Sequence, residues 1–239
     1  MARNILIVGA TGSLGSIFAR GLTARGHNSG LMARTEADLT ALKQSLGPGR
    51  SIVIPADACI HSNVEMAMAK TREEFGSVDV VLNVAGEWVQ DSLDTPDEEA
   101  DKAYAAGERQ FMRIPYVVGR VASRVFREQG HGLIAHMSTH AVLREKIYLK
   151  ENDVYGSMKE GGHFFMLRMN QYHAVNNTGV LVTILIPGIV NVPKLAHRLD
   201  TEEKRRGAVQ PEAMVEWLID NLDNKEIPLE MSFPSTTEL

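Results

Sequence analysis

The chain has 239 residues, of which 44% are hydrophobic and 23% charged, and its formal net charge is -5. These ordinary globular values exclude a disordered or fibrous chain, and the acidic balance disfavours nucleic-acid binding as the main function. A single cysteine, Cys59, excludes an internal disulfide and a cysteine-based cluster, and the histidines show no tight ligand spacing, so no metal site is predicted. The N-terminus is unlike a signal peptide, and no apolar run reaches about 18 residues, so we expect a cytoplasmic protein without membrane spans.

The first strand-turn-helix unit has the pattern of a dinucleotide-binding site. Residues 5–8 are wholly apolar, as in a central parallel strand, and they lead into a glycine-rich turn followed by apolar residues at helical spacing. Glycines let the backbone approach a pyrophosphate, and free N–H groups at the helix start point toward it. The candidate cofactor contacts from this turn are Gly9, Thr11, Gly12, Ser13, Leu14 and Gly15.

The end of the second predicted strand, residues 29–33, indicates which nicotinamide cofactor binds. An acidic residue at this place accepts hydrogen bonds from the adenosine ribose and repels a 2'-phosphate. This chain instead has Ala33, Arg34 and Thr35. Because a guanidinium suits phosphate recognition, NADP(H) is predicted over NAD(H). The alternative is that Arg34 is a surface residue at the start of a helix over 36–46.

Two further strands are predicted to end at the same crevice. The third covers residues 52–57, and its Asp57, followed by Ala58, either meets adenine or caps a helix that begins near His61. The fourth covers residues 78–83 and is followed by small residues that let the backbone lie against a ribose or nicotinamide. Its candidate cofactor contacts are Asn83, Ala85 and Gly86.

The alternation of strands and helices predicts an α/β fold, a doubly wound parallel sheet in one Rossmann-like domain over residues 1–239. Residues 88–99 are acidic and are predicted to form a loop over the crevice, whereas residues 103–127 have a long helical pattern. The expected substrate loops lie near 87–95, 144–154 and 192–207.

The fifth strand, residues 133–137, delivers Ser138 and Thr139 to the crevice, and the following helix is predicted to carry Tyr155 and Lys159. A spacing of four places the phenol and the ammonium on one helix face. A phenol, with a pKa of about 10, becomes a useful acid or base at neutral pH only where a nearby positive charge favours the phenolate. Lys159 is placed to supply that charge.

The same helix continues through a broadly apolar stretch, which suggests burial or a subunit interface. Met166 is expected in the core. Gly161 and Gly162 lower the helix propensity, so close backbone packing is expected there. The sixth strand covers residues 179–186 and is followed by Pro187 and Gly188.

Together these features, in this order along residues 4–222, resemble the short-chain dehydrogenase/reductase family. The resemblance implies an NAD(P)-dependent oxidoreductase in which a tyrosine is the acid/base and a serine steadies the substrate oxygen. A lysine binds the nicotinamide ribose and lowers the pKa of the tyrosine. The candidate catalytic residues are therefore Ser138, Thr139, Tyr155 and Lys159, with the choice between the two hydroxyls open. Further implied cofactor contacts are Tyr155, Lys159, Pro187, Gly188 and Val190, and a homodimer or homotetramer is expected.

The chain departs from the family pattern in several places. Ser13 stands where shorter members usually have a glycine, and Phe111, next to Gln110, stands where many members carry a catalytic asparagine. Residues 191–192 replace a common threonine, which affects a contact to the nicotinamide amide. Residues 227–233 replace a glycine-rich strand, which makes a family-type tetramer less certain.

The predicted function is hydride transfer between NADP(H) and a carbonyl or alcohol carbon of a small molecule, with Tyr155 as acid/base. The departures leave open a non-catalytic NADP(H)-binding sensor, and the glycine spacing leaves open an epimerase or lyase on the same fold. Arg144, Lys146, Lys194 and Arg198 would suit an anionic substrate, but exposed basic residues are common on loops, so the sequence does not name the substrate.

Overall fold

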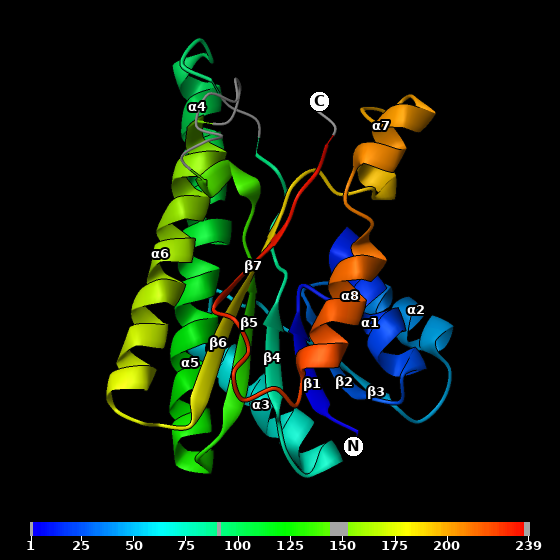
Figure 1. Cartoon of the computed structure of the whole chain (residues 1–239), viewed down its shortest axis with the longest axis vertical. Helices are drawn as coiled ribbons and strands as arrows, with labels where there is room; N and C mark the ends of the chain where they lie inside the picture. The colour runs from blue at the N-terminus through cyan, green and yellow to red at the C-terminus, as the bar shows by residue number, and fades with distance from the viewer. Residues whose placement is uncertain (1, 90–91, 144–152, 237–239) are drawn as a thin grey trace.

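A seven-stranded parallel sheet forms the centre of the protein (Figure 1). The structure, a computed structural model, describes residues 2–89, 92–143 and 153–236. The strand order is β3-β2-β1-β4-β5-β6-β7, which is the doubly wound arrangement predicted from the sequence, with its reversal between β1 and β4. The strands are β1 (Asn4–Val8), β2 (Asn28–Ala33), β3 (Ser51–Pro55), β4 (Val80–Asn83), β5 (Gly132–Met137), β6 (Val180–Pro187) and β7 (Glu230–Phe233).

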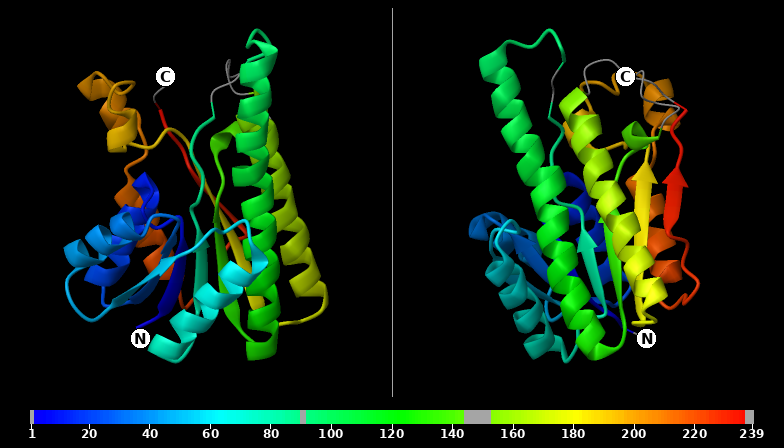
Figure 2. Two further views of the ribbon diagram at one scale, coloured as in Figure 1. Left: turned by 180° about the vertical axis from the view of Figure 1, so that it is seen from behind. Right: turned by 90° about the vertical axis from the view of Figure 1, so that its left-hand side faces the viewer.

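The last strand, β7, lies beside β6 at the edge of the sheet (Figure 2). It contains no glycine, and it still pairs in parallel, with Ile184 opposite Glu230 and Ile186 opposite Ser232. Phe233 packs into the core on one face of the sheet. Because successive side chains of a strand alternate between faces, Glu230 and Ser232 point to the other face, the one that α6 covers.

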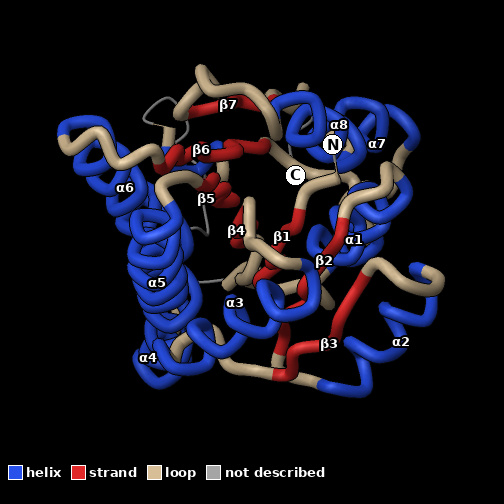
Figure 3. Tube along the Cα trace, turned by 90° about the horizontal axis from the view of Figure 1, so that it is seen from below, coloured by secondary structure: helices blue, strands red, loops and turns tan. Residues whose placement is uncertain are grey.

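Helices cover both faces of the sheet (Figure 3). One face carries α1, α2 and α8, and the opposite face carries α3, α5 and α6. The helices are α1 (Ser13–Ala24), α2 (Glu36–Leu46), α3 (His61–Phe75), α4 (Asp97–Gly107), α5 (Ile114–Gln129), α6 (Asp153–Val175), α7 (Glu202–Gly207) and α8 (Pro211–Asn221), with a π-helical segment η1 (Glu108–Arg113) and two 3-10 turns, η2 (His140–Val142) and η4 (Pro193–Leu195).

The central strand β1 shows why its sequence is apolar at every position. Ile5 and Ile7 belong to the core cluster under α1, α2 and α8, whereas Leu6 and Val8 belong to the cluster under α3, α5 and α6. All four are buried, and fully burying a side chain of this kind stabilises the fold by about 1.5–3 kcal/mol. The side chains of β1 therefore contribute to the hydrophobic core on both faces of the sheet.

The long helical pattern after β4 forms one rod made of α4, η1 and α5. The acidic segment that we predicted as a loop through residue 99 becomes helical at Asp97, and this part of the prediction is wrong. Acidic residues in the first turn of α4 favour the helix there, because the N-terminus of a helix carries a partial positive charge. The π-helical segment η1 inside the rod was not predicted, and such segments are frequent at functional sites.

The glycine pair in α6 lies against this segment, as its sequence predicted. A Cβ on Gly162 would lie 2.2 Å from the carbonyl oxygen of Phe111, and a Cβ on Gly161 would lie 2.4 Å from the Met112 sulfur. The two glycines thus let α6 approach the backbone of η1. Met166, one turn further, is fully buried, as expected.

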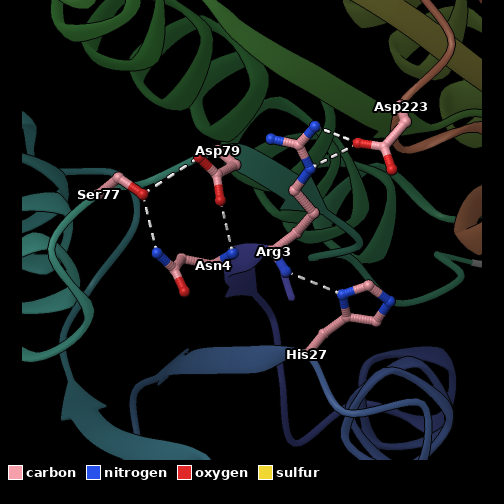
Figure 4. Close-up of polar contacts among 6 residues, drawn as sticks. All are labelled: Arg3, Asn4, His27, Ser77, Asp79 and Asp223. Atoms are coloured by element: carbon pink, nitrogen blue, oxygen red, sulfur yellow. Dashed lines mark hydrogen bonds and ion pairs between the residues drawn. The ribbon is translucent and has the colours of Figure 1, made fainter. Parts of the chain in front are cut away.

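Polar contacts fasten the amino-terminal edge of the sheet (Figure 4). The Asn4 N–H donates to an oxygen of Asp79 at 2.8 Å, and the Arg3 N–H donates to Nδ1 of His27 at 3.0 Å. The Arg3 guanidinium donates to Asp223, and this hydrogen bond holds the pKa of that carboxyl below its usual range. These bonds join β1, β2, β4 and the segment after α8, at the edge opposite the carboxyl ends where ligands bind in such sheets.

Candidate active site

The glycine-rich turn after β1 is held close to the loop after β4. Gly9 has a φ of +87° and its N–H donates to the Met32 carbonyl at 2.9 Å. A Cβ on Gly9 would lie 2.7 Å from the Ala85 Cα, so both the conformation and the space favour glycine here. Gly12 caps α1 without a side-chain hydrogen bond to the first turn. The N–H groups at the start of α1 therefore remain available to an anion.

A cavity of about 510 Å³ opens beside this turn, at the carboxyl ends of β1 to β4. It brings together most of the predicted cofactor contacts, namely Gly9, Thr11, Gly12, Ala33, Arg34, Thr35, Asp57, Ala58, Ala85 and Gly86. It also includes Arg109 and Gln110 from η1, which the sequence analysis did not assign. The helical pattern of residues 103–127 places both residues on a helix. It does not reveal the π-helical segment, so it does not indicate that they face the crevice.

Other predicted cofactor contacts do not line the cavity with their side chains. Gly15 belongs to the packing of α1 on the turn, since its Cβ would lie 2.1 Å from the Gly9 carbonyl oxygen. Asn83 is buried, with its amide 3.3 Å from His136 Nδ1 and its oxygen accepting the Ala85 N–H. The remaining residues outside the lining are Ser13, Leu14, Pro187, Gly188 and Val190, of which Val190 is buried beside Val209.

Asp57 is held in place from two sides. Its carboxylate accepts the Cys59 N–H at 3.0 Å and pairs with the Arg109 guanidinium. Burial raises the pKa of Asp57, but the Cys59 N–H and Arg109 outweigh burial, so the pKa is lower than usual. The helix α3 begins after Ile60 without a side-chain cap, so the capping role considered for Asp57 is wrong. Asp57 lines the cavity, and its contact with adenine stays a prediction.

Three of the four predicted catalytic side chains, those of Thr139, Tyr155 and Lys159, lie together outside the cavity lining. The Phe111 ring lies beside both the loop after β4 and this group, because a Cβ on Gly86 would lie 2.6 Å from the ring and the Tyr155 ring meets it edge to face, with centroids 5.2 Å apart. The Thr139 side chain interacts with the Tyr155 phenol and lowers its pKa. The Lys159 Nζ lies 6.0 Å from the Tyr155 ring centroid. Tyr155 and Lys159 thus share one face of α6, as their spacing predicted.

The environment of this pair shifts both pKa values. Burial lowers the pKa of Lys159 to about 8, although its Nζ donates to the Met137 carbonyl at 2.9 Å and lies 4.9 Å from the Phe111 ring centroid. Burial raises the pKa of Tyr155 above its ordinary value, against the lowering effect of the Thr139 hydrogen bond. In this structure burial dominates and raises the pKa of Tyr155, whereas we expected the charge of Lys159 to dominate and lower it.

The two hydroxyl residues after β5 have different surroundings. Ser138 is buried, and its Oγ lies 2.9 Å from Nδ1 of His163 on α6. Thr139 faces Tyr155, and its Oγ1 also accepts the Ala141 N–H at 3.3 Å. The hydroxyl in contact with the tyrosine is therefore that of Thr139, a distinction that the adjacent sequence positions did not make.

A sequence profile described as short chain dehydrogenase matches residues 3–204. The chain belongs to the short-chain dehydrogenase family. Its relatives include the short-chain reductase NovJ of Streptomyces niveus, which is 29% identical over 87% of this chain and 77% of that protein. The D-beta-hydroxybutyrate dehydrogenase of Rhizobium meliloti is 25% identical over 95% of this chain and 86% of its own. The structure of ElxO with NADP bound covers 98% of both chains with a TM-score of 0.82 at 18% identity, which shows the shared fold.

In this short-chain dehydrogenase two of the expected substrate loops are joined by side-chain contacts. Lys194 pairs with Glu87 at 3.1 Å, and the Arg198 guanidinium lies 4.2 Å from the centroid of a Trp88 ring. Lys194 and Arg198, two of the four basic residues considered for an anionic substrate, are thus engaged with the opposite loop, and the other two, Arg144 and Lys146, lie outside the described residues. Most of the third loop, residues 144–152, lies outside the described residues. Neither a helix able to span a membrane nor a three-residue cluster of metal-ligating side chains occurs in the described parts of the chain.

Proposed function

We propose that this family member is an NADP(H)-dependent oxidoreductase that transfers hydride between the nicotinamide and the carbonyl or alcohol carbon of a small molecule. The observation that carries this proposal is the contact between Tyr155 and Thr139, with Lys159 one helical turn away and the glycine-rich cavity beyond Gly86. A proton donor, a hydrogen-bond donor and a cation thus gather beside a site suited to a dinucleotide.

The residues around the cavity fit such a cofactor. Its volume of about 510 Å³ lies in the ordinary range for small-molecule sites, and the close backbone at Gly9 and the uncapped start of α1 suit a pyrophosphate. Arg34 is exposed at the rim. Among the described residues it has no hydrogen-bond or ion-pair partner, so its guanidinium can meet a 2'-phosphate.

The proton chemistry follows from the side chains around Tyr155. When bound, the nicotinamide supplies or accepts the hydride. In the reductive direction, Tyr155 donates its phenolic proton to the developing alkoxide, and Thr139 donates a hydrogen bond to the same oxygen. Burial keeps the phenol protonated, which suits an acid. Lys159 is mostly cationic below about pH 8 and stabilises the phenolate that remains after proton transfer.

The experiment that tests the function follows NADPH absorbance with acetoacetate, chosen because one relative acts on D-beta-hydroxybutyrate, and with a panel of ketones and cyclic diketones. We expect net NADPH consumption with at least one carbonyl. Tyr155→Phe should lower kcat by about 10² to 10⁴ while NADPH affinity stays near that of the wild type. Wild-type turnover in this variant would contradict the assignment. Chemical change without net NADPH consumption would instead support an epimerase or lyase, and cofactor binding without either would support a sensor.

Self-association and a cytoplasmic location are part of this proposal. A groove of about 260 Å³ on the outer side of α5 and α6 is lined by apolar side chains that include Met112, Tyr116 and Phe165, and Phe164 is 60% exposed nearby. Such a surface supports a homo-oligomer. Light scattering of the purified chain, compared with Phe164→Lys, tests this part, because a charge placed in an apolar interface should shift the protein toward the monomer.

A further inference from the structure

A chain of buried polar contacts links the active-site strand to the last strand of the sheet. The Ser138 hydroxyl lies 2.9 Å from His163 Nδ1, and His163 Nε2 lies 2.9 Å from an oxygen of Glu230. Ser138 and His163 are 2% and 6% exposed, and the Glu230 side chain is 46% exposed. In the tautomer with its proton on Nε2, His163 donates a hydrogen bond to the Glu230 carboxylate, and its Nδ1 accepts a hydrogen bond from the Ser138 hydroxyl. Both the serine hydroxyl and the imidazole then have hydrogen-bond partners.

This serine, histidine and glutamate do not form a nucleophilic site. Ser138 is 2% exposed and its hydroxyl is paired with His163, so its oxygen is closed to a substrate carbonyl. The three residues come from β5, α6 and β7, and the links between them are internal. Their role must therefore concern the arrangement of the strand ends.

A second contact reaches the same strand end from the other side of Thr139. His140 Nε2 lies 2.8 Å from Ser232 Oγ. Glu230 and Ser232 are two residues apart in β7 and point to the same face of the sheet. Strand β7 therefore engages Ser138 through His163 and engages His140 directly, with Thr139 between the two attachments.

We propose that His163, Glu230 and Ser232 are positioning residues, which hold the Ser138–Thr139–His140 segment on β7 so that the Thr139 hydroxyl stays against Tyr155. The inference rests on the proposed function for Tyr155 and extends it to residues that do not touch the reacting atoms. Thr139 lies at the junction between β5 and the short turn η2, where few backbone bonds restrict it. The side-chain contacts of its two neighbours, Ser138 and His140, restrain the position of Thr139 instead.

The test uses Glu230→Ala, Ser232→Ala and the double variant, each in the full chain. The matched controls are Glu230→Gln, which still accepts a hydrogen bond from His163, and Glu160→Ala, which removes an exposed carboxylate from α6. The first readout is tyrosinate absorbance after a rapid pH jump, with each spectrum subtracted from that of the same variant carrying Tyr155→Phe. The second is kcat and KM with NADPH and the best carbonyl of the panel.

We expect the double variant to ionise Tyr155 at a higher pH than the wild type, because Thr139 no longer donates to the phenolate. Its kcat should fall about tenfold with KM for NADPH changed less than about twofold, and both controls should behave as the wild type. An unchanged Tyr155 ionisation in the double variant would overturn the inference, and so would a loss of NADPH affinity as large as the loss of kcat. If no carbonyl is reduced by the wild type, the proposed function fails while the ionisation readout still decides this inference.

Discussion

The ring of Phe111 lies against the ammonium of Lys159, with Nζ 4.9 Å from the ring centroid. Since the lysine is buried, its charge is stabilised by this ring and by the Met137 carbonyl rather than by water. The Met137 carbonyl and the aromatic faces of Phe111 and Tyr155 do not fully replace the hydration of Lys159, as its pKa of about 8 indicates.

The buried ammonium makes stability depend on pH in a defined direction. The folded pKa of Lys159, about 8, lies below its ordinary value of 10.5, so between these values the unfolded chain binds more protons than the folded one. Stability therefore rises as pH increases through this window, and the cost of burying the charge is greatest below about pH 8. We expect Lys159→Met to be more stable than the wild type at pH 7, by an amount that falls by about 2–3 kcal/mol on going to pH 10.

Urea unfolding of the wild type and Lys159→Met without cofactor, at pH 7 and pH 10, checks this expectation. Carrying out both measurements in a Tyr155→Phe background removes the opposing contribution of Tyr155. A difference that does not change with pH would mean that Lys159 is not desolvated in the folded protein.

The hydrogen bond between Thr139 and Tyr155 predicts which hydroxyl acts in the reaction. Thr139→Val keeps the shape of the side chain but removes the donor, so kcat should fall by about 10² or more, in the range seen when one oxyanion donor is lost. Thr139→Ser keeps the donor and should retain most of the turnover. Steady-state kinetics of both variants provide the measurement, and a loss in Thr139→Ser as large as that in Thr139→Val would contradict the role given to the hydroxyl.

Gly156 and Gly162 of α6 have different surroundings, so we expect alanine substitutions at these two positions to change stability in opposite directions. A Cβ on Gly162 would lie 2.2 Å from the Phe111 carbonyl oxygen, which is backbone and cannot move away cheaply, so Gly162→Ala should destabilise the fold by about 1–3 kcal/mol. A Cβ on Gly156 has the Ala141 oxygen at 3.9 Å as its nearest neighbour, so Gly156→Ala should stabilise the helix by up to about 1 kcal/mol. Denaturant midpoints of the two variants give the comparison, and the same sign for both would refute this packing.

Much of the sheet was predictable because its sequence signals are local. The wholly apolar stretch of β1 corresponds to burial on both faces, and the helix α2 begins and ends at the predicted residues, 36 and 46. The predicted contact of Gly162 was also confirmed, since a glycine pair in a helix implies a close neighbour even when that neighbour is unknown.

The parts of the site that escaped prediction depend on contacts between distant residues. Ser138 and Thr139 follow the same strand and have similar chemistry, and the contact that distinguishes the surroundings of Ser138 comes from His163, which is 25 residues away in the chain. The ion pair between Asp57 and Arg109 of the π-helical segment likewise joins residues far apart in the chain. No periodicity distinguishes a π-helical segment from the α-helix around it, so the facing of Arg109 had no signal in the sequence.

Arg34 provides the sharpest test of cofactor choice. Its guanidinium is exposed at the rim of the cavity, where a 2'-phosphate would gain charge-assisted hydrogen bonds worth about 1.5–3 kcal/mol, whereas the same position offers NADH no comparable partner. We therefore expect Arg34→Ser to weaken NADPH binding by about 10- to 100-fold and NADH binding by less than about threefold.

Arg72→Ser removes an exposed guanidinium from α3, away from the cavity lining, and should change neither affinity. Fluorescence titrations with both cofactors supply the four affinities, and tighter NADH than NADPH binding by the unaltered protein would refute the role given to Arg34. The salt dependence of NADPH binding should also weaken in Arg34→Ser, because an exposed ion pair is screened by salt.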